Sequence, residues 1–202
     1  MSGKEQNNIL LFNKWDTNEI SIVDEGLKNV ILIKPNMAIP ITFGRHEHQR
    51  LKKSEVHIIE RLANKLMHFG KRYAKNTGRM GGKKARVINA VKTALDIIYL
   101  ETGKNPVELL IRAIENSAPN EDTTRIVYGG VVYHVSVDVS PLRRVDLALR
   151  FIAEGVRMLS YSNTHSIEEV LAKEIILAST SDMNSYAIKK KNEQERIAMS
   201  SR

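Results

Sequence analysis

The middle of the sequence carries a dense run of basic side chains. Residues 71–86 contain no acidic residue and seven basic ones, which are Lys71, Arg72, Lys75, Arg79, Lys83, Lys84 and Arg86. Like charges at this density repel one another unless a polyanion neutralises them. Nucleic acid is the first candidate for that polyanion and an acidic lipid surface is the second. An ordinary solvated basic face is the alternative that needs no ligand.

Glycines in the same region raise the question of a nucleotide-binding loop. They stand at positions 70, 78, 81 and 82. A P-loop requires Gly-x-x-x-x-Gly-Lys-Ser/Thr after a strand. Here Thr77 stands where the first glycine should be, and Lys84 stands where the hydroxyl residue should be. We therefore interpret the glycines as allowing the backbone to approach a phosphate ribbon, with the N–H groups of the following helix facing the anion.

Other chemistry finds little support in the residue types. The chain has no cysteine, which excludes a disulfide framework, a thiol nucleophile and a cysteine-ligated metal. His46, His48 and His57 lack a His-Glu-x-x-His pattern, and their cationic neighbours would repel a divalent metal. We expect phosphate or base contacts for them, with no metal and no cofactor. Asp138 and Asp146 stand near Arg143 and Arg144, so we expect ion pairs there rather than an acid–base site.

The charge is sharply partitioned along the chain. The 202 residues have a net charge of +8, and 42% of them are hydrophobic, which is enough for a core. Residues 45–92 carry fourteen basic and three acidic side chains, whereas both flanking parts are slightly acidic. Aromatic residues make up only 5%, which favours contact with phosphates and helical shape over base stacking. We find no apolar run of ~20 residues and no signal peptide, so we expect a soluble, cytoplasmic protein.

Apolar spacing and capping residues predict a mainly α-helical chain. The first helix is expected over residues 55–69, with Ser54 as its N-cap and Gly70 as its C-cap. Arg61 and Lys65 are expected on its polar face. Further helices are expected over 84–103, 105–118, 141–160 and from 167, and the tail from 184 could form a last one. Capping boxes are expected at Asn105–Glu108 and Ser166–Glu169.

A β-hairpin interrupts the helical pattern at about residues 122–139. Two β-rich runs flank Gly129 and Gly130, a turn pair typical of hairpins. The hairpin could cap the helices, or it could project Arg125, Tyr128 and a basic, glycine-rich tip toward RNA or a partner. Residues 1–44 have no helical period. We interpret them as an N-terminal extension with short strands or extended segments, which could form an arm that lies on something else, and residues 45–202 as the helical domain.

Four stretches resemble the small-subunit ribosomal protein seven family, in its archaeal and eukaryotic branch. They are 60–67 (ERLANKLM), 125–144 (RIVYGGVVYHVSVDVSPLRR), 146–152 (DLALRFI) and 184–198 (NSYAIKKKNEQERIA). The similarity covers about residues 45–202 in order. It implies a bundle of about six helices with an inserted β-ribbon. It also implies binding to the 3′ major domain of small-subunit rRNA, nucleation of head assembly, and a position near the exit-site tRNA and the mRNA exit channel.

The resemblance also implies which residues bind. The rRNA-binding set comprises the seven basic residues of the 71–86 run together with Arg45, His46, Arg50, Lys52, Lys53, Arg143 and Arg144. The set near tRNA and mRNA comprises Arg125, Tyr128, Gly129, Gly130, Lys189, Lys190 and Lys191. Neighbouring head and platform proteins are the expected protein partners, and no membrane and no enzymatic activity are expected. A free RNA- or DNA-binding regulator and an RNA-modifying enzyme remain the alternatives.

Overall fold

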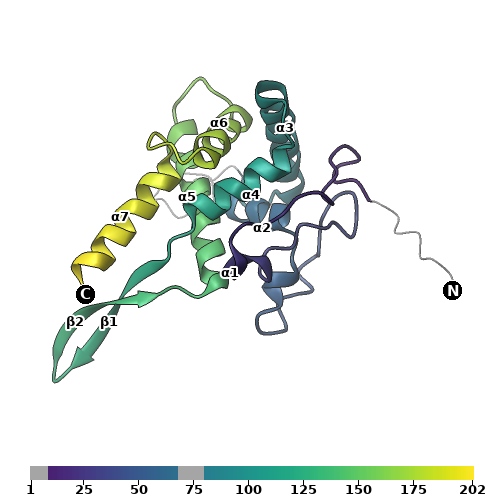
Figure 1. Ribbon diagram of the computed structural model, residues 1–202. Helices are drawn as coiled ribbons and strands as arrows, with labels where there is room; N and C mark the ends of the chain where they lie inside the picture. Colours follow the sequence, from purple (N-terminus) through teal and green to yellow (C-terminus); the bar gives the residue numbers. More distant parts are fainter. Residues whose placement is uncertain (1–8, 68–79) are drawn as a thin grey trace.

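The computed structural model describes residues 9–67 and 80–202, and its helices lie mostly where the apolar spacing predicts them. In chain order the helices are α1 (Glu25–Lys28), the 3₁₀ turn η1 (Lys52–Glu55), α2 (Ile58–Leu66), α3 (Lys84–Thr102), α4 (Pro106–Ser117), α5 (Pro141–Ser160), α6 (Ile167–Ser179) and α7 (Tyr186–Ser200). The strands β1 (Glu121–Tyr128) and β2 (Val131–Asp138) form a ribbon that extends away from the helices (Figure 1). The mainly α fold with an inserted hairpin is confirmed.

Helix ends coincide with residues that satisfy free backbone groups. The Asn105 side chain accepts the Val107 N–H at 3.1 Å and begins α4. Ser166 and Glu169 form the predicted capping box of α6. Gly103 ends α3 with a φ of 68°, a conformation that costs other residues energy. The capping box predicted for α4 does not form, because Glu108 instead accepts a hydrogen bond from Arg112.

The first predicted helix begins later than expected. Ser54 lies inside η1, and the N-cap of α2 is His57, whose Nδ1 accepts the Ile59 N–H at 3.2 Å. Val56 is extended between the two helices and is buried, so the chain makes a corner there rather than one continuous helix. The predicted C-cap, Gly70, lies outside the described residues.

The core lies where α6 meets the other long helices. Helix α6 packs on α3, α4 and α5, and α5 also contacts α2 and α7. Leu62, Leu95, Leu110, Leu149 and Leu171 are fully buried, so each helix from α2 to α6 contributes to one apolar cluster. Within the described ranges, no helix is both long enough and apolar enough to cross a membrane.

The segment 9–44 joins this core, and of the short strands or extended segments predicted for it the structure has no strand. Leu11 and Leu27 are fully buried in the same cluster, and the only helix there is α1. Leu32 forms a single bridge to His57 rather than a strand. The division at residue 45 into extension and domain stays a prediction.

The ribbon has the predicted turn but not the predicted tip chemistry. Tyr128 pairs with Val131 across Gly129 and Gly130, whose φ angles of 57° and 82° suit a two-residue turn of the primed type. Residues 126–133, which form the tip, carry no charged side chain. The tip is therefore apolar and exposed, with Tyr128 80% accessible.

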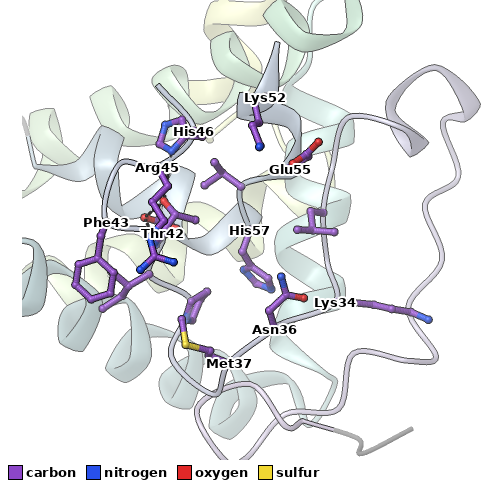
Figure 2. Close-up of a pocket in the computed structure, with 15 residues that line it drawn as sticks. Lys34, Asn36, Met37, Thr42, Phe43, Arg45, His46, Lys52, Glu55 and His57 are labelled. Carbon is purple, nitrogen blue, oxygen red and sulfur yellow. Dashed lines mark hydrogen bonds between the residues drawn. The ribbon is translucent and has the colours of Figure 1, made fainter. Parts of the chain in front are cut away.

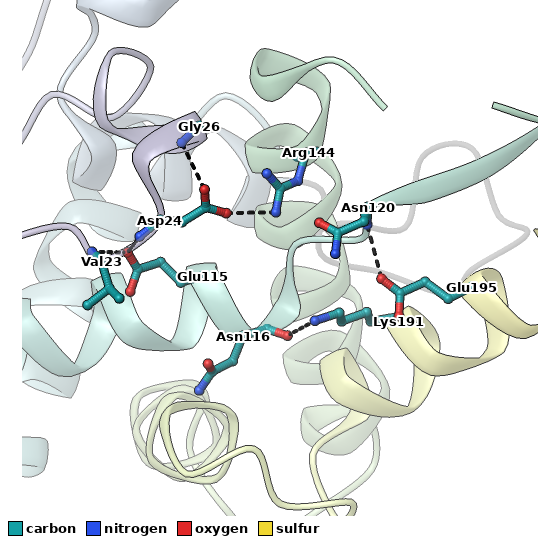
Figure 3. A network of polar contacts seen from close by, with 9 residues as sticks. All are labelled: Val23, Asp24, Gly26, Glu115, Asn116, Asn120, Arg144, Lys191 and Glu195. Atoms are coloured by element: carbon teal, nitrogen blue, oxygen red, sulfur yellow. Dashed lines mark hydrogen bonds and ion pairs between the residues drawn. The ribbon is translucent and has the colours of Figure 1, made fainter. Parts of the chain in front are cut away.

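Helix α7 supports the base of the ribbon. The Glu195 carboxylate accepts the Asn120 N–H at 3.0 Å, and Lys191 donates to the Asn116 carbonyl at 2.9 Å (Figure 3). Arg202 forms an ion pair with Glu121 on β1. The tail is thus an ordered helix that contacts both α4 and β1.

Candidate nucleic-acid interface

A groove of about 1140 Å³ lies between the 41–51 loop, η1, α2 and the start of α3. We call it the basic groove, because its lining includes the cationic side chains of Lys53, Arg61, Lys65 and Lys84. Two carboxylates pair with three of these cations, and each of the two joins elements that are distant in the sequence.

Glu60 is the first of the two carboxylates. It is fully buried, and its carboxylate accepts the Thr42 N–H at 3.0 Å and the Thr42 hydroxyl at 2.9 Å. It also forms an ion pair with Lys84. A buried charge needs such partners to offset its lost hydration. Glu60 therefore holds the 42–51 loop against the beginning of α3, and Lys84 is used within the protein.

Asp146 on α5 is the second carboxylate that pairs with cations of the groove. It accepts from Lys53 at 2.7 Å and pairs with Arg61 at 3.3 Å, and the Arg61 side chain is only 1% exposed. Burial acts to raise the pKa of Asp146, but the hydrogen bond from Lys53 and the charges of Lys53, Arg61 and Lys65 outweigh it, so the pKa is lowered. The predicted partners Arg143 and Arg144 are therefore wrong for Asp146, and Arg61, expected on the polar face of the helix, is buried.

Arg143 and Arg144 serve other contacts. Arg144 binds Asp24 at 2.8 Å and so ties the N-terminal segment to α5 (Figure 3). Arg143 is 64% exposed and lies 3.4 Å from Asp122 at the base of the ribbon. Arg144 is thus chiefly structural, whereas Arg143 keeps most of its surface for a ligand.

Lys65 is a groove residue that sequence reasoning left out of the binding set. Burial is the main cause of its lowered pKa; Asp146 opposes the shift, and repulsion from Lys53, Arg150 and Arg61 adds to it. Within the described residues it has no hydrogen-bond partner, so an incoming phosphate would relieve this repulsion. Its i, i+4 spacing from Arg61 was the signal available in the sequence.

Several predicted cations that are next in the sequence to groove residues have no ion pair among the described residues. Arg45, Arg50, Lys83 and Arg86 are exposed, Lys52 is half-buried, and none of them forms an ion pair within the described ranges. Helix α3 begins after Lys83 without a side-chain cap, which leaves its first N–H groups available. His46 lies 3.3 Å from the Thr42 hydroxyl. The other predicted cations, Lys71, Arg72, Lys75 and Arg79, lie outside the described residues.

The predicted residues near tRNA and mRNA fall in two places. Arg125, Tyr128, Gly129 and Gly130 are exposed toward the end of the ribbon, away from the helices. On α7, Lys189 is exposed, Lys190 pairs with Glu193, and Lys191 is bound to the end of α4. Lys191 therefore supports the fold, and the three lysines do not form one uniform patch.

His57 lies beside the groove and is a structural residue. It is 4% exposed, its Nε2 donates to the Ile33 carbonyl at 2.7 Å, and its Nδ1 caps α2. Burial lowers its pKa to about 4, with smaller opposing effects from the Ile33 carbonyl and Glu60. Both ring nitrogens are occupied by the protein. Among the described residues, no three His, Asp or Glu side chains converge as metal ligands.

This pKa predicts a pH-dependent stability. Between pH ~6.5 and ~4 the unfolded chain takes up a proton at His57 that the folded chain refuses, so the free energy of unfolding falls as the pH falls. The loss reaches about 3 kcal/mol. Urea titrations from pH 7 to 4 would show this acid loss in the wild type and a smaller one in His57→Asn, which keeps a capping oxygen. An equal fall in the free energy of unfolding of both proteins would contradict the prediction. The control is His165→Asn, which replaces an exposed histidine.

Comparison with known proteins decides the family. The sequence model of the family described as "Ribosomal protein S7p/S5e" matches residues 32–202. The chain belongs to this family. It is 62% identical to the small ribosomal subunit protein uS7 of Cenarchaeum symbiosum (strain A), over 98% of this chain and 99% of that one. It is 45% identical to the protein of the same name from Methanosphaera stadtmanae, over 94% and 97% of the two chains.

These matches confirm the resemblance stated from the sequence, including its archaeal and eukaryotic type. They also confirm that a protein of this S7p/S5e family is a ribosomal constituent rather than an enzyme. The family match begins at residue 32, whereas the resemblance stated from the sequence begins at about residue 45. The added residues belong to the segment that packs into the core.

Proposed function

We propose that this S7p/S5e protein is a structural component of the small ribosomal subunit and that it binds rRNA through the basic groove and the free cations around it. The observation that carries the proposal is the arrangement around Glu60 and Asp146. Two carboxylates fix three cationic side chains from η1, α2 and α3, while Lys65 and further cations stay without an ion pair among the described residues. The relatives named small ribosomal subunit protein uS7 support the same function.

The groove would act by neutralising phosphates. Cations that are already held in place lose little freedom on binding, and the counterions that they displace from RNA make the affinity fall with salt. The 3′ major domain is the part of the rRNA we propose, with nucleation of head assembly as the consequence. The protein would act there in the cytoplasm, beside neighbouring head and platform proteins.

We assign the ribbon and α7 to the exit-site tRNA and the mRNA exit channel. The ribbon extends away from the helices, and Glu195 of α7 holds its base (Figures 1 and 3). Arg202, which follows α7, forms an ion pair with Glu121 on β1. Its exposed tip is apolar, so it would contact bases or a protein rather than phosphates. In this proposal, groove and ribbon have separate tasks.

Shortening the ribbon tests this division. Replacing residues 126–133 with Asn-Gly keeps the strand bases that α7 contacts, so the affinity for small-subunit rRNA should stay within about threefold, whereas exit-site tRNA retention by reconstituted subunits should fall. Filter binding measures the rRNA affinity, and the rate of tRNA release measures the retention of exit-site tRNA. Exchanging only Gly129 for Asn, which keeps the full ribbon, is the control. A tenfold loss of rRNA affinity in the shortened protein would refute separate tasks.

A further inference from the structure

A second cavity adjoins the basic groove along the 41–46 loop. It measures about 550 Å³ and lies between the 34–46 segment, η1 and the start of α2 (Figure 2). Figure 2 shows His57 between Lys34 on one side of the view and Phe43 with Arg45 on the other. Its size lies within the range of small-ligand pockets.

The two ionisable groups deep in this cavity do not need a ligand. Glu60 is saturated by Thr42 and Lys84, and His57 uses both ring nitrogens on the backbone. Buried Val56 and Pro40 line the same space. The deep part therefore offers an apolar wall without an open charge.

The rim has the opposite character. Lys34, Arg45 and Lys52 line it without an ion pair among the described residues, and Glu55 is the one rim carboxylate. The Asn36 side chain is exposed and has no hydrogen bond within the described part of the chain, so its amide has a donor and an acceptor free. The rim therefore carries a positive excess beside one amide.

Phe43 is the feature that the free protein does not explain. Its side chain is 77% exposed, although a phenyl group gains from burial. Its backbone has a φ of 52°, in the left-handed region that residues other than glycine rarely adopt. Strain of this kind persists where the surrounding structure holds a residue for a purpose. Here the strain holds an aromatic ring at the mouth of a cavity.

We propose that this cavity holds one unstacked nucleotide of the rRNA. The base would stack on the Phe43 ring, its edge would bond to Asn36, and its phosphate would lie against the rim cations. An apolar side chain of a neighbouring protein is the competing occupant, but it would leave the rim cations unneutralised. The inference rests on the proposed function, because it takes rRNA as the partner.

The test separates stacking from charge. Phe43→Ala should weaken binding to full-length small-subunit rRNA by about tenfold or more and leave its salt dependence unchanged, because stacking releases no counterions. Phe43→Tyr should restore the affinity. Arg45→Ala should instead lower the salt slope by about 0.7 to 0.9. Ile39→Ala, which removes a half-exposed side chain outside the cavity, is the control. Unchanged affinity in Phe43→Ala would overturn the proposal.

A cross-linking arm identifies the occupant. Benzoylphenylalanine placed at position 43 in reconstituted small subunits should react with one rRNA nucleotide, and reaction with protein alone would overturn the proposal in favour of a side chain. If wild-type protein shows no salt-dependent rRNA binding at all, the proposed function itself fails. If wild-type protein binds and Phe43→Ala binds equally well, only the nucleotide site fails.

Discussion

Replacing Arg45, Lys83 and Arg86 with alanine is expected to weaken binding to small-subunit rRNA about 10²-fold at about 100 mM salt. These three side chains are exposed and unpaired within the described residues, and each is next in the sequence to a residue that lines the basic groove. Each is proposed to neutralise one phosphate, so each loss removes one released counterion from the binding free energy. Filter binding with full-length rRNA measures the effect.

The choice of residues matters for this result. Lys84 is left intact because it is the partner of buried Glu60, and its removal would disturb the loop as well as the charge. A matched control changes Lys104, Arg112 and Lys173, which are also exposed but do not stand beside groove residues in the sequence. An equal loss in the control would show that net charge alone drives binding, and the groove assignment would then be wrong.

Asp146→Asn is expected to lower the free energy of unfolding by about 3–5 kcal/mol at pH 7. The substitution leaves Arg61, whose side chain is 1% exposed, without its counter-ion and also removes the partner of Lys53. Folding lowers the pKa of Asp146, so its stabilising contribution is fully present above pH ~4 and is lost below that pH as the carboxyl protonates. Urea unfolding at pH 7 therefore measures the whole stabilising contribution of the Asp146 carboxylate.

Two comparisons isolate the ion pair. Asp96→Asn breaks a more exposed pair with Lys14 and should cost no more than about 1 kcal/mol. Combining Arg61→Met with Asp146→Asn should recover part of the loss, because no unpaired guanidinium then remains buried. Additive costs in the double variant would contradict the structural role given to Asp146.

Features set by neighbouring residues could be predicted from the sequence. The N-caps at Asn105 and Ser166 and the turn at Gly129 depend on hydrogen bonds or backbone angles within a few positions. The corner at Val56 could not be predicted in this way. His57 caps α2 while its Nε2 bonds to Ile33, a partner far back in the chain.

The ion pairs of the candidate site could not be predicted from the sequence either. The block of positive charge was visible in the composition, but the partners that hold it were not. Asp146 bonds to Lys53 across 93 positions, and Arg144 reaches Asp24 across 120. Such pairs depend on packing and not on local spacing, so the sequence could not distinguish structural cations such as Lys84 from free ones such as Arg86.

The salt dependence of rRNA binding shows whether the cations at the groove neutralise phosphates. We would measure the affinity of the wild type, the groove variant and the control variant between about 50 and 200 mM salt. We expect a steep wild-type slope of log affinity against log salt, a slope shallower by about two to three in the variant that lacks Arg45, Lys83 and Arg86, and an unchanged slope in the control. Parallel slopes for the wild type and this variant would show that the three side chains do not neutralise phosphates.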